Sequence, residues 1–380
     1  MSDDPGVENV AIQPPDIIGD LKFPATIATR RVFDEMQVYE IDPLRDPRWP
    51  DLLERDPRSS IFHTRGWLSA LQRSYGYEPV VLTTSGPGKE LTNGVAFCRV
   101  KSWLTGQRLV SLPFSDHCEP LITQPEEIQS ISGFLQKEIK SKNLSYAELR
   151  PLEPMQKVAG FKESSNYLFH KLDLRPSCDE LYRHFHNDCI RRKIQRSQRE
   201  GLTYEKGTSR QLLAKFYGVF AMTRHRHGLP PAPFSWLCNV MDCVKGNAQI
   251  RVASHNGNPV AVMLTLTHNR SIVYKYGGSD LRYSNLGGLA LLFWKTIQEA
   301  KTESIQELDF GRCETDNPGL IKYKDRWGTT KSNISYWRMS GSAALASSTR
   351  WHAGIATRIF PYVPQTLRIR IGDFLYRHAG

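Results

Sequence analysis

Two acidic residues at the ends of predicted strands are the first candidates for acid or base chemistry. Asp116 follows one such strand, and Asp309 lies in the run Leu-Asp-Phe-Gly-Arg that ends at Arg312. A carboxylate in such a place can take up a proton or orient a base. A structural role is the alternative for both residues, since Asp309 can pair with Arg312 and Asp116 can form a turn. His117, beside Asp116, is a further candidate.

Residues 319–328 place cations among aromatic residues and glycines. Cations grouped in this way can steer an anion, and a lysine near a reacting carbonyl can stabilise the negative charge that develops on its oxygen. We therefore predict Lys324 as a catalytic residue, with Tyr323 and Trp327 packed against its stem. Arg312 is predicted to bind the same substrate. The alternative is a surface lysine that pairs with a neighbouring acid.

Residues 274–289 are predicted to form a strand, a glycine-rich turn and the start of an apolar helix. Glycines just before a helix let its free N–H groups approach an anion, and the helix dipole adds partial positive charge. We predict that this segment binds an anionic donor through Tyr276, Arg282, Asn285, Gly287 and Gly288. In the alternative, the glycines only permit a tight turn.

A basic helix is predicted between Ser177 and Gly201. Its start has the Ser-x-x-Glu form of a capping box, and its apolar residues change face near Asp188, which predicts a bend there. Arg192, Arg196 and Arg199 follow at spacings that place them on one face, where they can hold phosphates. The alternative is a solvated helix face.

The predicted elements occur twice in the same order: a helix, a meander, a helix and two strands. They are 62–75, 79–84, 94–100, 108–114, 125–140, 146–149 and 167–174, then 211–227, 249–254, 260–267, 271–276, 286–301, 307–310 and 333–337. Asn256-Gly257 between two strands is a strong hairpin signal. We predict an α+β protein of two units that join near residue 175, with mixed, largely antiparallel sheets flanked by helices.

The ends of the chain differ from its middle in composition. We predict a flexible leader over residues 1–28, two domains over 29–175 and 176–340, and a basic helical tail over 341–380. An apolar stripe in the tail docks on the protein itself or, in the alternative, lies on an anionic membrane. The stripe consists of Leu367, Ile371, Phe374 and Leu375.

Composition excludes several classes of protein. With 380 residues, of which 40% are hydrophobic, the chain is neither a small disulfide-stapled module nor wholly disordered. Its 50 Lys and Arg against 39 Asp and Glu give a net charge of +11, which favours an anionic partner. The seven cysteines include no Cys-x-x-Cys pair, so we expect reduced thiols and no metal. An acidic N-terminus and the lack of a long apolar run predict a cytoplasmic protein.

Taken together, these motifs resemble the FemAB-like branch of the GNAT superfamily, in particular its BioF2-like acyltransferase domain. The resemblance covers roughly residues 50–378 and rests on spaced motifs in one order. They are Phe62-His63-Thr64 with Trp67, the run 111–116, the basic helix with Arg191-Arg192-Lys193-Ile194 and Gly201-Leu202, the run 276–279, the run 308–312, and Tyr323-Lys324 with Trp327-Gly328.

The resemblance implies tandem GNAT-like domains that transfer an acyl or aminoacyl group to an amine. Lys324 matches the lysine of the Fem-type Phe-Lys-x-x-Phe-Gly motif, near the acceptor end of the tRNA, with Tyr323 and Trp327 as aromatic departures. Arg282-x-x-Asn285-x-Gly287 is similar to the GNAT pyrophosphate loop, except that Asn285 replaces a glycine.

The implied donor is acyl-CoA, acyl carrier protein or aminoacyl-tRNA, with no tightly bound cofactor. The implied acceptor is an amine of a cell-envelope, peptidoglycan or exopolysaccharide precursor, which a lipid can present at the inner membrane face. A different class of function stays open. In that alternative the chain binds nucleic acid without catalysis, through the basic helix over residues 183–199.

Overall fold

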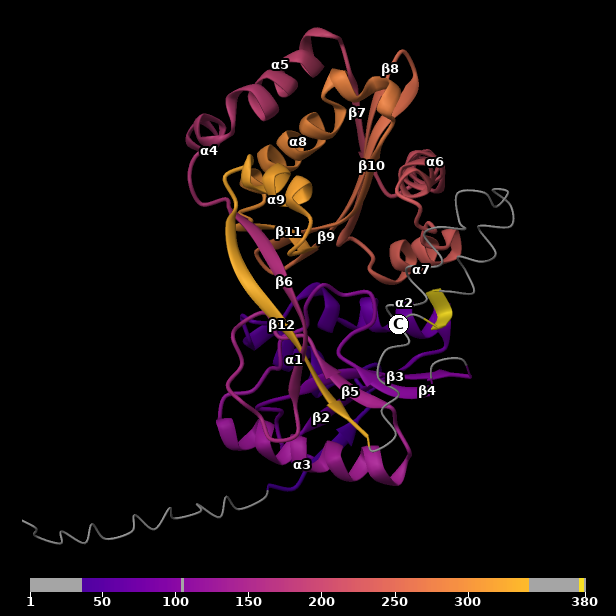
Figure 1. Ribbon diagram of the computed structural model, residues 1–380, viewed down its shortest axis with the longest axis vertical. Helices are drawn as coiled ribbons and strands as arrows, with labels where there is room; N and C mark the ends of the chain where they lie inside the picture. Colours follow the sequence, from indigo (N-terminus) through magenta and orange to yellow (C-terminus); the bar gives the residue numbers. More distant parts are fainter. Residues whose placement is uncertain (1–35, 104–105, 342–375, 379–380) are drawn as a thin grey trace, which may run out of the picture. The chain divides into compact units, whose positions relative to one another are not determined.

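The described residues contain a twelve-stranded sheet, flanked by helices on both faces (Figure 1). The structure is a computed structural model that describes residues 36–103, 106–341 and 376–378. The strand order is β1-β2-β3-β4-β5-β12-β6-β11-β10-β9-β8-β7. The predicted class, α+β with a mixed and largely antiparallel sheet, is confirmed.

The first half of the chain alternates short helices with antiparallel strands. Its elements are β1 (Tyr39–Ile41), α1 (Arg48–Arg55), a 3-10 turn (Ile61–His63), α2 (Arg65–Tyr75), β2 (Glu78–Thr83), β3 (Val95–Ser102), β4 (Gly106–Val110), α3 (Pro125–Ser141), β5 (Tyr146–Leu149) and β6 (Lys162–Asp173). The strand predicted to reach Phe114 ends at Val110, and the chain then turns into a loop. The helix α1 was not predicted.

The second half holds a longer meander between helices. Its elements are α4 (Cys178–His184), a π turn (Asn187–Arg191), α5 (Arg192–Arg199), β7 (Thr203–Gly207), α6 (Arg210–Arg226), α7 (Phe234–Cys243), β8 (Ala248–His255), β9 (Asn258–His268), β10 (Ser271–Ser279), a 3-10 turn (Leu281–Leu286), α8 (Gly288–Thr302), β11 (Glu307–Glu314), α9 (Pro318–Asp325) and β12 (Thr330–Ser340). The helices α7 and α9 were not predicted.

Local signals in the second half act as predicted. Strands β8, β9 and β10 pair antiparallel, and Asn256 and Gly257 adopt the left-handed backbone that their hairpin requires, with φ of 49° and 77°. The Ser177 hydroxyl accepts a hydrogen bond from the Glu180 N–H, and the Glu180 carboxylate accepts one from the Ser177 N–H. The predicted bend occurs as the π turn over Asn187–Arg191.

Parallel pairing is brief and occurs once in each half. β4 pairs with β5 over three residues, and β10 pairs with β11 from Ser271↔Glu307 to Val273↔Asp309. Beyond that point β10 continues to Ser279 beside β9 alone, while β11 shifts register between Asp309 and Arg312. The two strands therefore separate just where the candidate residues of the second half begin.

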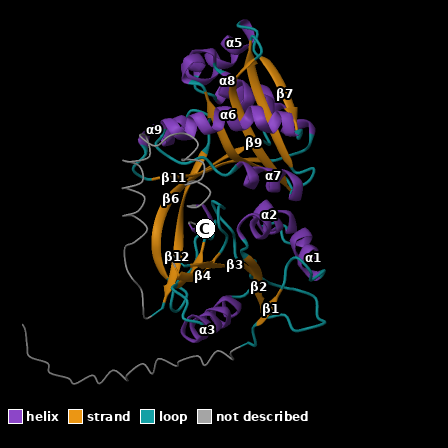
Figure 2. Cartoon of the chain, turned by 90° about the vertical axis from the view of Figure 1, so that its right-hand side faces the viewer, coloured by secondary structure: helices purple, strands orange, loops and turns teal. Residues whose placement is uncertain are grey.

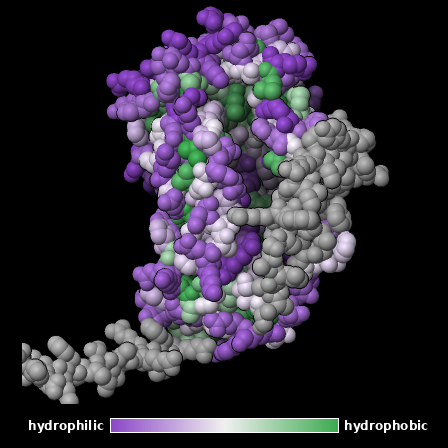
Figure 3. Space-filling view, viewed as in Figure 1, coloured by the Kyte–Doolittle hydropathy of each residue, from purple (hydrophilic) through white to green (hydrophobic). Residues whose placement is uncertain are grey.

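Three large hydrophobic clusters hold helices against the sheet (Figure 2). One packs α3 against β2, β3 and β5, and another packs α8 with α4 and α5 against β8 and β9. The largest joins α1 and α2 with α6 and α7, so it includes residues from both halves. Its rings meet directly, as in the Trp67–Trp236 pair at 5.2 Å. The coloured part of the face drawn in Figure 3 is mainly hydrophilic.

The sheet is continuous between the two halves. Strand β12, from the second half, lies between β5 and β6 and pairs antiparallel with both. Each half still has its own meander and its own parallel pair. The domain boundaries near residues 175 and 340 stay predictions. The leader over 1–28 and the apolar stripe at 367–375 lie outside the described residues.

Candidate active site

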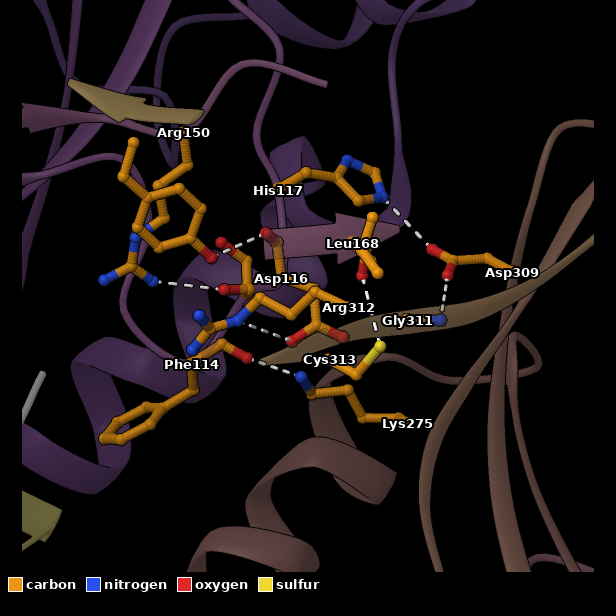
Figure 4. A network of polar contacts seen from close by, with 12 residues as sticks. Phe114, Asp116, His117, Arg150, Leu168, Lys275, Asp309, Gly311, Arg312 and Cys313 are labelled. Carbon is orange, nitrogen blue, oxygen red and sulfur yellow. Dashed lines mark hydrogen bonds and ion pairs between the residues drawn. The ribbon is translucent and has the colours of Figure 1, made fainter. Parts of the chain in front are cut away.

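The loop after β4 carries Asp116 and is held by residues far away in sequence (Figure 4). Arg150 Nη1 donates to the carbonyl oxygens of Leu112 at 2.6 Å and Ser115 at 3.1 Å. The Tyr336 hydroxyl donates to the Asp116 carbonyl at 2.7 Å. These bonds fix the backbone on both sides of the Asp116 carboxylate, so its position is set before any substrate binds.

The register shift in β11 provides the opposite wall of the site. Gly311 has a φ of 74°, which favours glycine, and its N–H donates to Asp309 Oδ1 at 2.5 Å. A Cβ atom at Gly311 would lie only 2.6 Å from Asp116 Oδ2. The glycine therefore allows the turn and also leaves room for the carboxylate from the first half.

Arg312 projects from this bulge toward Asp116. Its Nε lies 3.8 Å from Asp116 Oδ1, and its guanidinium lies over the Tyr167 ring, 3.8 Å from the centroid. Burial alone raises the pKa of Asp116, but the charges of Lys275 and Arg312 outweigh it and lower that pKa below its usual value. The Asp116 carboxylate is consequently ionised at neutral pH.

Lys275 belongs to the same cluster, although the sequence did not single it out. It lies in β10, and its Nζ donates to the Phe114 carbonyl at 2.6 Å. The ammonium is also 5.4 Å from the centroid of the Phe62 ring. Burial lowers the pKa of Lys275 despite the opposing attraction of Asp116. A lysine between two tyrosines in an otherwise apolar strand was the available signal.

Lys324 lies at the end of α9 and is 4% exposed. Its Nζ donates to the carbonyl oxygens of Gly311 at 2.7 Å and Arg312 at 3.0 Å, and burial lowers its pKa. Tyr323 and Trp327 pack in the core with α8, and their predicted packing against the Lys324 stem stays a prediction. The ammonium was expected to face an acyl carbonyl, but it contacts the backbone of the β11 bulge.

His117 and Asp309 form a buried pair across the two halves. His117 Nε2 lies 3.1 Å from Asp309 Oδ2, and the two side chains are 7% and 2% exposed. The rings of Phe62 and Phe169 lie edge-on to the imidazole, each with its centroid at 5.4 Å. Asp309 therefore has a partner other than Arg312, and a carboxylate that holds an imidazole in this way is a common arrangement around a general base.

The glycine-rich turn is closed by the protein's own residues. Gly287 has a φ of 77°, and a Cβ atom there would lie 2.3 Å from the Lys193 carbonyl of α5. Likewise, a Cβ atom at Gly288 would lie 2.9 Å from the Cβ atom of Ala261. The close approach that these glycines allow is thus to the protein itself, and their binding of a donor stays a prediction.

The other predicted residues of this turn differ in how exposed they are. Arg282 Nη2 pairs with Asp280 at 2.7 Å and is exposed, as is Asn285. Tyr276 lies deeper, its hydroxyl accepts a hydrogen bond from Trp236 Nε1 at 3.0 Å, and burial raises its pKa to about 12. Arg282 and Asn285 are therefore available at the surface, whereas Tyr276 supports the core.

The three arginines of the basic helix lie on its exposed side with acidic neighbours. Arg192 pairs with Asp188 at 3.1 Å, while Arg196 and Arg199 each lie 3.5 Å from Glu200. Surface pairs of this kind contribute little to stability, so the arginines can exchange these partners for phosphates. The structure does not place them with Asp116, Asp309, Arg312 and Lys324, which it brings together.

Comparisons with known proteins identify a matching domain and similar folds. Residues 186–325 match the family model for an acetyltransferase (GNAT) domain, and no curated protein matches the chain. FemX has a TM-score of 0.64 at 13% identity, with 84% of this chain and 100% of FemX covered. A tandem GNAT protein from the clavulanic acid biosynthesis pathway has a TM-score of 0.51 at 11% identity, with 80% of this chain and 98% of that chain covered.

A further similar structure is the C-terminal domain of a putative lysylphosphatidylglycerol synthetase from Agrobacterium fabrum. Its TM-score is 0.50 at 12% identity, with 82% of this chain and 95% of that chain covered.

Among the described residues, no group of three or more His, Cys, Asp and Glu side chains is placed to hold a metal ion, and no helix can span a membrane. Residues 186–325 thus match a GNAT acetyltransferase domain, and the described chain has a fold similar to those of FemX and the tandem GNAT protein, as the sequence predicted.

Proposed function

We propose that this acyltransferase moves an acyl or aminoacyl group from a carrier to an amine of a cell-envelope, peptidoglycan or exopolysaccharide precursor. The observation that carries the proposal is the cluster of Asp116, Lys275 and Arg312. It lies where β10 and β11 separate, and it contains residues from both halves of the chain. The acyl donor and the amine acceptor, which react with each other, can come together at this cluster.

The charges in this cluster suit attack of an amine on a carbonyl. The ionised Asp116 attracts the ammonium form of the acceptor, and Lys275 and Arg312 favour the negative charge that develops on the acyl oxygen. Lys324 holds the carbonyls of Gly311 and Arg312, which keeps the bulge and the guanidinium in place. In this proposal Asp116 holds the two cations in place and attracts the acceptor toward them, while the cations stabilise the transition state.

The donor is acyl-CoA, acyl carrier protein or aminoacyl-tRNA, and all three are anionic. The net charge of +11 and the exposed arginines of α5 support such a donor. The name of the similar Agrobacterium fabrum protein, a putative lysylphosphatidylglycerol synthetase, supports an aminoacyl donor and a lipid-linked envelope acceptor. We place the reaction in the cytoplasm, at the membrane surface when the acceptor is lipid-linked.

Transfer assays test this proposal directly. Purified protein is incubated in turn with each of the three donors and an amine acceptor, and the products are followed by mass spectrometry. We expect one donor to give an N-acylated product with wild-type protein. Asp116→Asn, which preserves size and removes the charge, should lower turnover about 100-fold or more. Tight nucleic-acid binding with no transfer from any donor would favour the noncatalytic alternative.

A further inference from the structure

A cavity of about 240 Å³ lies beside the last paired residues of β10 and β11. Its walls come from both halves of the chain, with Ser60 and Glu119 from the first half and Val273 and Asp309 from the second. Val273 and Asp309 form the last pair before the two strands separate. The cavity therefore reaches the point at which the two strands separate, next in sequence to Asp116 through His117.

His117 lines this cavity and has an unused polar atom. The side chain is 7% exposed, and its Nε2 is held at 3.1 Å by Asp309. Its Nδ1 is buried and has no hydrogen-bond partner among the described residues. A buried nitrogen without a partner lowers stability unless a bound molecule satisfies it, and this nitrogen can accept a proton while Asp309 holds the other side of the ring.

The inner cavity has an excess of acidic groups. Glu119, Glu153, Glu307 and Asp309 line it. Its two cations are already engaged, since Arg58 pairs with Asp56 at 2.6 Å and Lys171 with Glu307 at 3.0 Å. Such a lining attracts a cation, and the ammonium group of an acceptor is a cation of suitable size.

A larger groove of about 960 Å³ continues from the cavity, and it carries more cations than the cavity does. Six residues line both spaces, namely Pro57, Ser59, Lys171, His268, Ser271 and Glu307. The groove adds the exposed Arg55, Arg175 and Arg270, together with Glu54 and Asp173. Arg55 pairs with Glu90 and Arg175 with Asp173, whereas Arg270 has no ion pair among the described residues. A molecule that extends through both spaces therefore meets acidic groups at its inner end and guanidinium groups at its outer end.

We propose that the cavity and the groove form the acceptor channel of the enzyme, and that they select an amine attached to an anionic group. This inference rests on the proposed acyl transfer. The amine lies at the inner end beside His117 and Asp309, and the phosphate or carboxylate of the acceptor lies among the arginines. A phosphorylated amino sugar has this chemistry at a size that the two spaces accommodate.

His117 serves as the general base in this channel. The amine nitrogen forms a bond to the acyl carbon and loses a proton to His117 Nδ1. The bond from that carbon to the sulfur or oxygen of the carrier breaks, and the proton taken up by His117 passes to the leaving group to give a thiol or an alcohol. Asp309 holds Nε2 and stabilises the imidazolium that forms.

Binding of three simple probes tests the channel without any donor. Glucosamine 6-phosphate, glucosamine and N-acetylglucosamine 6-phosphate are titrated into the full chain by calorimetry. We expect glucosamine 6-phosphate to bind about tenfold or more tightly than either other probe, because it alone has both charges. Equal affinities for all three, or no measurable binding of any, would overturn the proposal.

Matched variants assign the two ends of the channel. Glu153→Gln should weaken the two amines and leave N-acetylglucosamine 6-phosphate unchanged, whereas Arg270→Gln should weaken the two phosphates and leave glucosamine unchanged. Arg210→Gln, at an exposed arginine of α6 outside the channel, serves as the control. A loss of phosphate binding in Arg210→Gln as large as in Arg270→Gln would mean that only overall charge matters, which contradicts the proposal.

Turnover tests the base with whichever donor supports transfer. We expect His117→Ala to lower kcat about 100-fold or more, to change KM for the amine little, and to recover partly with added imidazole. Asp309→Asn preserves size and should lower kcat as well. Wild-type kcat in His117→Ala, or a loss that imidazole does not restore, would overturn the base assignment. If wild-type protein transfers from no donor, the proposed function fails, while the binding experiment still decides the channel.

Discussion

The starts of α3 and α8 occupy similar places in the two halves, since each helix follows a strand that pairs in parallel. The two helix starts nevertheless differ in their capping groups. At α3, Glu127 is buried and its Oε2 accepts hydrogen bonds from the N–H groups of Thr123 at 2.7 Å and Gln124 at 3.0 Å. At α8, Gly287 provides no side-chain cap, and the first turn contains no acidic residue. The first half thus supplies a carboxylate at the start of its helix, and the second half does not.

This difference indicates which half can bind a donor. A carboxylate at a helix start satisfies the N–H groups and the positive end of the dipole, so α3 has no remaining capacity for a phosphate. No carboxylate occupies the start of α8, and Arg282 and Asn285 are exposed beside it, so we expect a donor to bind there and not at α3. The matched acetyltransferase domain, residues 186–325, also includes α8 and excludes α3.

Replacing Lys324 is expected to have the largest effect, because it acts on the bulge of the second half. Lys324→Met keeps the stem and removes the two hydrogen bonds to Gly311 and Arg312. We expect kcat to fall about 10²- to 10³-fold, because the bulge no longer holds the Arg312 guanidinium in place at the acyl oxygen, and stability to fall by about 1–3 kcal/mol. Lys322→Met, at an exposed lysine of the same helix, is the control. A lowered melting temperature with wild-type kcat would make Lys324 purely structural.

The pH dependence of stability tests the role of His63, a buried histidine of the first half. Burial, as the main cause, lowers the pKa of His63 to about 4 from 6.5, and Ser60 N–H donates to its Nδ1 at 3.0 Å. The folded state then binds fewer protons than the unfolded state between these values, so stability falls as pH decreases from 6.5 to 4. The loss should approach about 3 kcal/mol.

Denaturant melts at several pH values check this expectation. His63→Gln should flatten the decline of stability between pH 6.5 and 4, whereas His184→Gln, at an exposed histidine of α4, should leave it unchanged. An equally steep decline in His63→Gln would assign the acid sensitivity to other groups.

Local signals in the sequence predicted most elements, whereas contacts between residues far apart in the sequence could not be predicted. Asn256-Gly257 defined its hairpin because only a few residues determine that turn. Asp116 and Asp309 were candidates from their places at strand ends, but their neighbours depend on packing between segments about 190 residues apart. Lys275 was missed for that reason, and the β12 position between β5 and β6 likewise follows from long-range pairing.

The cap of α3 should affect stability alone. Glu127→Gln removes the charge that accepts from Thr123 and Gln124, so we expect a loss of about 1 kcal/mol with unchanged kcat. Glu126→Gln, in the same first turn, tests whether charge near the helix end suffices without the hydrogen bonds. A fall in kcat for Glu127→Gln would mean that the first half also binds substrate.

The exposed arginines of α5 should give the smallest change, in substrate affinity. Replacing Arg192, Arg196 and Arg199 together by Gln should raise KM for the donor several-fold and weaken its dependence on salt, since exposed charges are screened over about 10 Å at 0.1 M salt. The kcat value should stay the same. Kinetics identical to wild type at every salt concentration would show that these arginines only face solvent.

Hydrogen exchange with the working donor tests the central claim most directly, namely that the donor binds in the second half. Exchange of backbone amides is followed by mass spectrometry with and without a nonhydrolysable analogue of that donor. The account predicts protection of residues 276–291, which include the glycine-rich turn and the start of α8, and no change at residues 123–128 before and within α3. Protection at residues 123–128 in place of the start of α8 would contradict it.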